Sequence, residues 1–166
     1  MPSRHQPSRR AARHLAIALV PTLLMLGIRA WLVEPVTVTS DSMEPAITQG
    51  SVVLMYKPAT VSGPPRAGDI IAFISPQDGH TAIKRVVALG GQQLAIRDGE
   101  LYVDGQHVPE PSIDHSRIDA TYYGPIVIPP GTMFVLGDNR GVSIDSRDYG
   151  PVPLAAIQGS MTSIHR

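Results

Sequence analysis

Proline constrains the main part of this chain more than any other feature. Residues 34–166 contain thirteen prolines, spread from Pro35 to Pro153. Because a proline inside a helix removes a backbone hydrogen bond and clashes with the preceding turn, few stretches here can form a helix. Short runs rich in β-branched residues lie between turn signals instead. We expect strands at Val36–Thr39, Ser51–Tyr56, Asp69–Ile74, Thr81–Ala88, Gln93–Arg97, Glu100–Val103, Ile126–Ile128 and Met133–Leu136.

Two short segments between these runs carry turn residues. Asp98-Gly99 separates two strand-like runs and predicts a hairpin, because glycine adopts positive φ without a steric penalty. Asp104-Gly105 indicates a further turn. The fold class that follows for residues 34–166 is mostly β, a compact and barrel-like arrangement of antiparallel sheets.

The N-terminal part differs in composition from the rest. Residues 15–28 carry no charge, and apolar residues continue after Arg29 to Val33. A membrane span needs roughly 20 mostly apolar residues, and Pro21 is tolerated in such a helix. We therefore expect a basic cytoplasmic segment at residues 1–14, one transmembrane helix at residues 15–33 and an extracytoplasmic β-domain at residues 34–166.

The charge distribution gives the orientation. The chain has no net charge, but residues 1–33 hold five arginines and no acid, whereas residues 34–166 hold nine basic and fourteen acidic side chains. Positive charge before the span predicts an N-terminus inside the cell. A cleavable signal peptide is the alternative, although its best site, Ile28-Arg29-Ala30, has a large residue at −3. Both interpretations place residues 34–166 outside the cytoplasm.

Composition also excludes several classes of function. The chain has no cysteine, so it has no disulfide, no cysteine nucleophile and no cysteine-bound metal. The acidic main part argues against a nucleic-acid-binding surface. Motifs for a P-loop, a dinucleotide-binding turn or an HExxH zinc site do not occur.

Two polar segments follow strand-like runs. The first, Ser40–Pro45, reads SDSMEP and places two serines around one residue at a strand end, where one hydroxyl can act as nucleophile and the other as hydrogen-bond donor. The second, Gly137–Asp148, alternates acids, arginines and serines and could form a network that orients a site. An ordinary turn and a solvated loop are the respective alternatives.

Lys84 is a candidate base within the run Thr81–Ala88. Period-two alternation places it on the face of Ala82, Val86 and Ala88. The chain has twelve arginines and only two lysines. A buried lysine can release its proton and an arginine cannot, so lysine at this position favours a base. A charge that protects an edge strand is the alternative.

Taken in order, several segments resemble the bacterial type I signal peptidases, which use a Ser/Lys dyad. They are WLVEPVTVTSDSMEPAITQGSVVL from Trp31, GDIIAF from Gly68, IKRVVALGG from Ile83, RDGELYVDGQHVPEP from Arg97 and GDNRGVSIDSRDYGPVP from Gly137. The resemblance implies a membrane-bound serine endopeptidase that removes N-terminal signal peptides from exported preproteins. It implies no metal and no other cofactor.

The resemblance also implies a role for each matching residue. Ser42 matches the nucleophile, Lys84 the general base, and Ser40 an oxyanion-hole donor beside the Ser42 N–H. Ser143 matches the serine that positions the lysine. The remaining matches are Asp145 and Arg147 as a structural ion pair, Asp138 and Arg140 in the same supporting motif, and Val36, Val38, Met43, Ile47 and Ile83 at substrate-pocket positions.

The same resemblance implies the partners and the location. Small pockets favour substrates with small residues at −1 and −3, and the enzyme is expected in the bacterial cytoplasmic membrane, in contact with lipid and near the secretion translocon. Asp41 departs from the family pattern, which has glycine there. If its carboxylate faced Lys84 it would favour the protonated lysine, and we expect it to face solvent.

Several alternatives stay open from the sequence. A relative dedicated to one pilin or conjugation substrate would use the same dyad. A Ser-His-Asp hydrolase would draw on His80, His107 or His115, each near acids, although no GxSxG motif supports it. A membrane-tethered, catalytically silent β-domain that binds peptides is an alternative of a different class.

Overall fold

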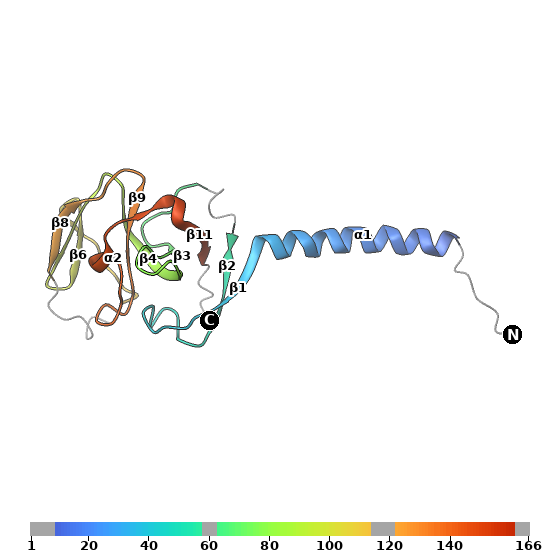
Figure 1. Ribbon diagram of the computed structural model, residues 1–166, viewed down its shortest axis with the longest axis horizontal. Coiled ribbons are helices and arrows are strands. Elements are labelled where there is room, and N and C mark those ends of the chain that lie inside the picture. Colours follow the sequence, from blue (N-terminus) through green and yellow to red (C-terminus); the bar gives the residue numbers. More distant parts are fainter. Residues whose placement is uncertain (1–8, 58–62, 114–121, 162–166) are drawn as a thin grey trace. The chain divides into compact units, whose positions relative to one another are not determined.

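The computed structural model describes residues 9–57, 63–113 and 122–161. The chain divides into one compact unit that ends at Val33 and a second that begins at Glu34. Helix α1 (Arg9–Leu32), drawn in blue in Figure 1, makes up the first unit and contains Pro21. Judged on the described residues, no helix combines the length and apolarity that crossing a membrane requires. Part of the predicted basic segment, residues 1–8, lies outside the described residues.

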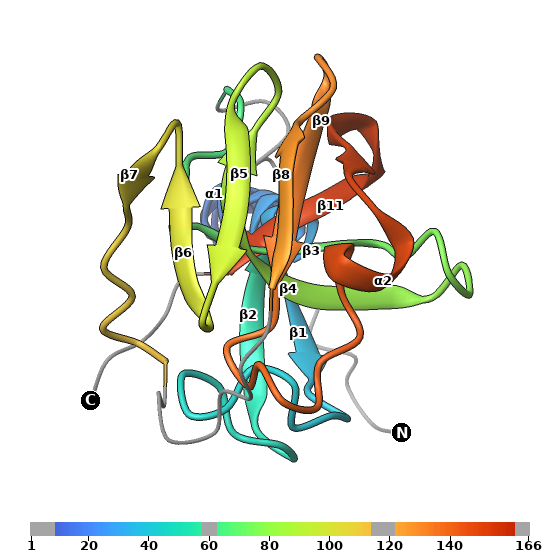
Figure 2. The same cartoon turned by 90° about the vertical axis from the view of Figure 1, so that its left-hand side faces the viewer.

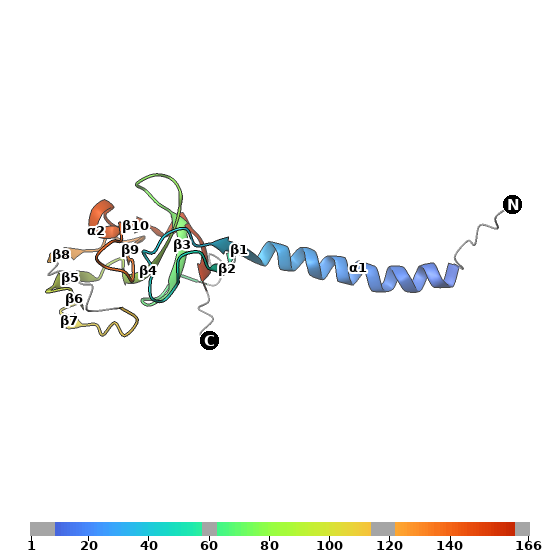
Figure 3. The same cartoon turned by 90° about the horizontal axis from the view of Figure 1, so that it is seen from below.

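The second unit is mostly β, as predicted. Its strands are β1 (Val33–Thr37), β2 (Val52–Tyr56), β3 (Ile70–Ile74), β4 (Thr81–Leu89), β5 (Gln93–Arg97), β6 (Glu100–Val103), β7 (Gln106–His107), β8 (Tyr123–Val127), β9 (Thr132–Leu136), β10 (Val152–Pro153) and β11 (Ile157–Met161). The described residues of this unit also include the helix α2 (Ser146–Tyr149) and a 3-10 turn (Leu154–Ala156). Figure 3 shows α2 and β10 beside β9.

The strands form two sheets. One has seven strands in the order β1-β2-β11-β3-β4-β9-β10, and the other has four in the order β7-β6-β5-β8. Figure 2 shows the smaller sheet from its face. In the larger sheet, neighbouring strands along the order β2-β11-β3-β4-β9-β10 pair antiparallel. All neighbouring strands of the smaller sheet also pair antiparallel. The predicted antiparallel class is therefore confirmed.

The expected turns also form. Asp98 and Gly99 join β5 to β6 with φ values of 52° and 78°. Asp104 and Gly105 join β6 to β7 with φ values of 52° and 76°. Two consecutive positive φ values are typical of the hairpin turns that match strand twist.

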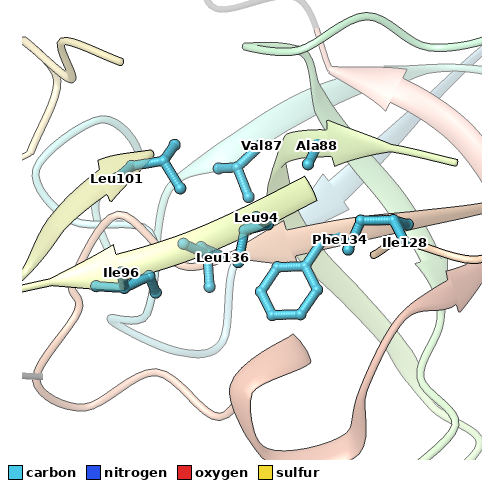
Figure 4. Packing of buried hydrophobic residues seen from close by; sticks show 8 residues of the cluster. All are labelled: Val87, Ala88, Leu94, Ile96, Leu101, Ile128, Phe134 and Leu136. Atoms are coloured by element: carbon cyan, nitrogen blue, oxygen red, sulfur yellow. The ribbon is translucent and has the colours of Figure 1, made fainter. Parts of the chain in front are cut away.

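The core lies between the sheets and on both faces of the larger one. Figure 4 shows the cluster that joins them, in which Leu94 of β5 packs with Phe134 and Leu136 of β9. On β3, Ile70 and Ala72 face one cluster and Ile71 and Phe73 face another, as a period of two requires. The first of these two clusters includes the segment that follows β1, so packing fixes that segment on the sheet.

The strands differ from the prediction at several places: β7 and β10 were not predicted, and β8 begins at Tyr123 rather than at Ile126. Strand β11, which lies between β2 and β3, was not predicted because Gly159 interrupts its pattern. A Cβ at Gly159 would approach the Met55 side chain to 2.5 Å, so close packing requires the glycine. Strand β1 begins and ends earlier than expected. The register of β4 against β9 shifts between Val86 and Ala88. Ala88 therefore packs in a different hydrophobic cluster from Val86. The strand face that was predicted to carry Lys84, Val86 and Ala88 together ends at Val86.

Candidate active site

Ser42 lies in a turn that buried neighbours attach to the core. Met43 and Ile47 pack in the cluster on one face of the larger sheet. The Ile47 N–H donates to the Met43 carbonyl at 2.9 Å, and the Glu44 N–H donates to the Asp41 carbonyl at 3.0 Å. These hydrogen bonds and packing contacts hold Ser42 in place in the turn that follows β1.

Strand β4 brings Lys84 to this serine. The Lys84 Nζ donates to the Ser42 Oγ at 2.7 Å. Ser42 is only 8% exposed and Lys84 only 6%. The Ser40 Oγ lies 3.1 Å from the Ser42 Oγ. The structure thus brings together three of the predicted site residues, two of them 42 positions apart in sequence.

The surroundings of Lys84 favour its neutral form. Burial lowers the pKa of Lys84 from its ordinary value of 10.5, and the Arg147 charge lowers it further. The carboxylates of Asp145, Asp138 and Asp148 act in the opposite direction and raise this pKa. Desolvation is the largest influence, so the net shift is downward. A lysine with a lowered pKa can accept a proton from a nearby hydroxyl.

Asp41, which departs from the family pattern, is exposed, as expected. The carboxylates that act on the pKa of Lys84 come from the Gly137–Asp148 loop. The departure at residue 41 is therefore compatible with a lysine base.

That loop supports the site through Asp145. Its Oδ2 accepts from the Gly137 N–H at 3.0 Å, and its Oδ1 accepts from the Arg147 Nε at 2.9 Å. Asp145 and Asp148 also form a capping box at the start of α2. The ion pair implied by the resemblance is present and is tied to the backbone at the end of β9.

Gly137 has to be glycine because the Ser143 side chain and the Ser42 carbonyl oxygen lie too close to its Cα to leave room for a side chain. A Cβ there would lie 2.2 Å from the Ser143 Oγ and 2.5 Å from the Ser42 carbonyl oxygen. Any larger residue would push apart the nucleophile turn and the loop that carries Ser143.

Asp138 and Arg140 each pair with a partner that the sequence did not indicate. Asp138 accepts two hydrogen bonds from Arg85, at 2.6 and 2.8 Å. Arg140 donates two to Glu110, at 2.5 and 3.0 Å, and one from Nε to the Gly137 carbonyl at 3.0 Å. Arg85 adjoins Lys84 and Glu110 lies in a proline-flanked loop, and neither position carries a local signal of its partner.

Ser143 lies close to the site without a hydrogen bond to Lys84. Its Oγ is buried and has no hydrogen-bond partner among the described residues. Its predicted role in positioning the lysine stays a prediction.

The histidines offer no second route to activating Ser42 within the described residues. His107 pairs with Glu100 on the exposed surface, and His80 is exposed. Within residues 9–57, 63–113 and 122–161, the side-chain partners recorded for Ser42 are Lys84 and Ser40. His115 lies outside these ranges.

A pocket of about 360 Å³ adjoins the Ser42–Lys84 pair. Its lining includes four of the five predicted substrate-binding residues, Val36, Val38, Met43 and Ile83. The fifth, Ile47, packs in the adjoining core. A larger cavity of about 650 Å³ beside Tyr56 and Arg66 contains neither Ser42 nor Lys84. The smaller pocket is therefore the one suited to a substrate of this pair.

Among the strands that the structure describes, one edge of β4 has no partner at this pocket. Thr81–Lys84 pairs with β3 on one side. On the other side, β9 pairs with β4 only from Arg85 onward. The backbone of Thr81–Lys84 can therefore pair with an extended peptide lying in the pocket.

The chain is similar in sequence to known signal peptidases. A family model described as signal peptidase, peptidase S26, matches residues 11–165. Signal peptidase I of Bacillus licheniformis is 33% identical over 138 residues, which cover 78% of this chain and 74% of that protein. Probable signal peptidase I-1 of Synechocystis is 36% identical over 155 residues, which cover 88% of this chain and 78% of that protein.

A solved structure shows the same fold. The crystal structure of a signal peptidase I from Enterococcus faecalis matches with a TM-score of 0.55 and 32% identity, and the match covers 60% of this chain and 98% of that one. The match to the family model spans most of the chain, including Ser42, Lys84 and the supporting loop. The chain therefore belongs to the signal peptidase family, peptidase family S26, and is a serine peptidase.

Proposed function

We propose that this chain is a membrane-anchored endopeptidase that removes signal peptides from exported preproteins through Ser42 and Lys84. The observation that carries the proposal is the buried hydrogen bond of 2.7 Å between the Lys84 Nζ and the Ser42 Oγ. A hydroxyl is a weak nucleophile unless an adjacent base accepts its proton. Lys84, with its lowered pKa, provides that base.

The first half of the reaction forms an ester. The Ser42 Oγ attacks the scissile carbonyl carbon while its proton passes to the Lys84 Nζ. The carbonyl oxygen becomes an oxyanion, which the Ser42 N–H and the Ser40 hydroxyl stabilise. When this intermediate collapses, the C–N bond breaks, and the Lys84 ammonium gives its proton to the departing amine of the mature protein.

The second half releases the signal peptide. A water molecule attacks the ester carbonyl and gives a proton to neutral Lys84, forming a second oxyanion. The C–O bond to Ser42 then breaks, and the lysine returns the proton to the Ser42 Oγ. The acid product is the signal peptide with a free carboxylate, and the enzyme is regenerated.

The pocket supports a preference for small residues at −1 and −3. An extended peptide paired with Thr81–Lys84 would place these two side chains on the same side, since side chains alternate along a strand. The pocket there is lined by Val36, Val38, Met43 and Ile83. These apolar walls favour alanine over charged or large residues.

The proposed membrane anchor rests on exposed apolar side chains of α1. Its side chains at Ile17, Leu19, Val20, Leu23, Leu24 and Met25 are exposed. We infer that lipid covers these side chains, that the N-terminus lies in the cytoplasm and that residues 34–166 lie on the outer face of the bacterial membrane, near the translocon. In sealed right-side-out vesicles, added protease should digest residues 34–166, and their protection would contradict this orientation.

The enzymatic proposal is tested by incubating the purified full chain with a preprotein that carries an Ala-X-Ala site. We expect cleavage directly after the second alanine, and no cleavage by Ser42→Ala because the nucleophile is lost. Mass spectrometry of the products locates the cut. A wild-type chain that binds the preprotein but never cleaves it would favour the peptide-binding alternative, and cleavage of one pilin substrate only would favour the dedicated relative.

A further inference from the structure

Asn139 connects the nucleophile turn to the loop that supports the site. It is only 5% exposed. Its backbone N–H donates to the Ser42 carbonyl at 3.0 Å, and its Nδ2 donates to the Asp41 carbonyl at 3.3 Å. One residue thus holds two consecutive carbonyl groups of the turn that carries the nucleophile.

The backbone of Asn139 is itself held firmly. Its carbonyl accepts from the N–H groups of Val142 and Ser143, at 3.3 and 3.1 Å. Its two sequence neighbours, Asp138 and Arg140, take part in ion pairs with little solvent exposure. The side-chain amide of Asn139 therefore projects from a fixed backbone toward Asp41.

The bond to the Asp41 carbonyl has a consequence for the Ser42 N–H. The carbonyl of residue 41 and the N–H of residue 42 belong to one planar trans peptide unit and point in opposite directions. Fixing the direction of the carbonyl therefore fixes the direction of the N–H. The Glu44 N–H donates to the same carbonyl from within the turn, whereas Asn139 reaches it from outside the turn.

We propose that Asn139 is a positioning residue that sets the direction of the Ser42 N–H in the oxyanion hole. The inference rests on the proposed function, in which that N–H stabilises the oxyanion. Without the Asn139 side chain, the Asp41–Ser42 peptide unit keeps one bond and gains freedom to rotate. The N–H is then poorly aimed at the oxyanion, while the pocket that binds the peptide is unchanged.

Substitution of the side chain isolates this bond. Asn139→Leu has a similar shape and removes the Nδ2 donor, but it keeps the backbone N–H that donates to the Ser42 carbonyl. Gln92→Leu is the matched control. Gln92 lies in the turn between β4 and β5, and its Nε2 donates to the Asp104 Oδ2 at 3.4 Å, so the substitution removes an amide donor that does not hold the nucleophile turn.

The test compares two peptides that differ only in the group at their C-terminal end. An Ala-X-Ala peptide ending in an aldehyde forms a hemiacetal on the Ser42 Oγ, with a negatively charged oxygen in the oxyanion hole and the hydroxyl proton on Lys84. The same peptide ending in a primary alcohol cannot be attacked and forms no oxyanion. The ratio of their dissociation constants therefore measures oxyanion stabilisation separately from peptide binding.

We expect Asn139→Leu to weaken aldehyde binding and to lower kcat by about 10- to 100-fold, somewhat less than the ~10²–10³-fold effect of deleting a donor. Alcohol binding and KM should stay within about twofold, since uniform binding is unaffected. Gln92→Leu should leave the aldehyde-to-alcohol ratio as in the wild type. Asn139→Ala repeats the measurement with a smaller side chain, and the melting temperature of each variant confirms that it is folded.

An unchanged ratio in folded Asn139→Leu or Asn139→Ala would overturn the inference, and so would an equal loss of both affinities. Failure of the proposed function looks different. In that case the wild type itself would bind aldehyde and alcohol equally, and Ser42→Ala would not reduce aldehyde binding.

Discussion

Replacing Lys84 with arginine will abolish peptide cleavage, whereas the same replacement at Lys57 will leave the rate unchanged. Arginine keeps the charge but does not release its proton, so Ser42 loses its base. General-base catalysis and the non-additivity of catalytic groups lead us to expect a loss of about 10³-fold or more in kcat. Steady-state cleavage of an Ala-X-Ala peptide by the full chain measures the effect.

Lys57 is a suitable control because it is the other lysine of the chain. Its side chain is 42% exposed and pairs with Glu34 at 2.7 Å. Its replacement changes the same chemical group in a solvated position. Substantial activity in folded Lys84→Arg would show that another group activates Ser42.

The same base gives the cleavage rate a defined pH dependence. Only neutral Lys84 can accept the Ser42 proton, so the rate should rise as the pH increases through the pKa of Lys84 and be lost as the pH falls below it. Burial lowers this pKa from 10.5, which brings the rising limb below the range of an ordinary lysine. A rate that rises only near the ordinary value would contradict a desolvated base.

Removing Glu110 will destabilise the catalytic domain far more than removing an exposed acid. Glu110 holds Arg140, whose side chain is 3% exposed, and Arg140 also donates to the Gly137 carbonyl. Breaking one side of a buried ion pair leaves the other charge without a partner and costs about 3–5 kcal/mol. Chemical denaturation of Glu110→Ala should show a loss of that size in the free energy of unfolding.

Glu34→Ala is the control for this measurement. Glu34 pairs with Lys57 in a bridge whose side chains are each more than 40% exposed, and exposed bridges contribute about 0–1 kcal/mol. The double variant Glu110→Leu with Arg140→Met should recover much of the lost stability, because it leaves no unpaired charge. Equal effects of Glu110→Ala and Glu34→Ala would show that the buried pair does not stabilise the domain.

Much of the fold could be predicted because local backbone conformation restricts which residues fit. The Asp98-Gly99 turn forms because two positive φ values suit these residues, and strands β5 and β6 have the predicted bounds. Strand β11 was missed because its glycine is explained only by contact with β2, a hundred residues earlier in the chain. The bulge in β4 likewise arises from its pairing with β9.

In the site, too, some features could be predicted from the sequence, whereas others depend on tertiary contacts. Ser42 and Lys84 were expected together from the order of motifs, and the structure places them in contact. The partners of Asp138 and Arg140 could not be predicted, since Arg85 and Glu110 are 53 and 30 residues away and pair through tertiary packing. Asn139 was overlooked because its contribution lies in backbone contacts of the nucleophile turn, which have no signature in the sequence.

The most direct test of the dyad identifies the nucleophile itself. The full chain is mixed with an Ala-X-Ala peptide, quenched in acid during turnover and analysed by mass spectrometry after digestion. The mechanism predicts an ester between the peptide's second alanine and the Ser42 Oγ, and no such adduct in Ser42→Ala. An ester on Ser40 or Ser143, or continued cleavage by Ser42→Ala, would contradict it.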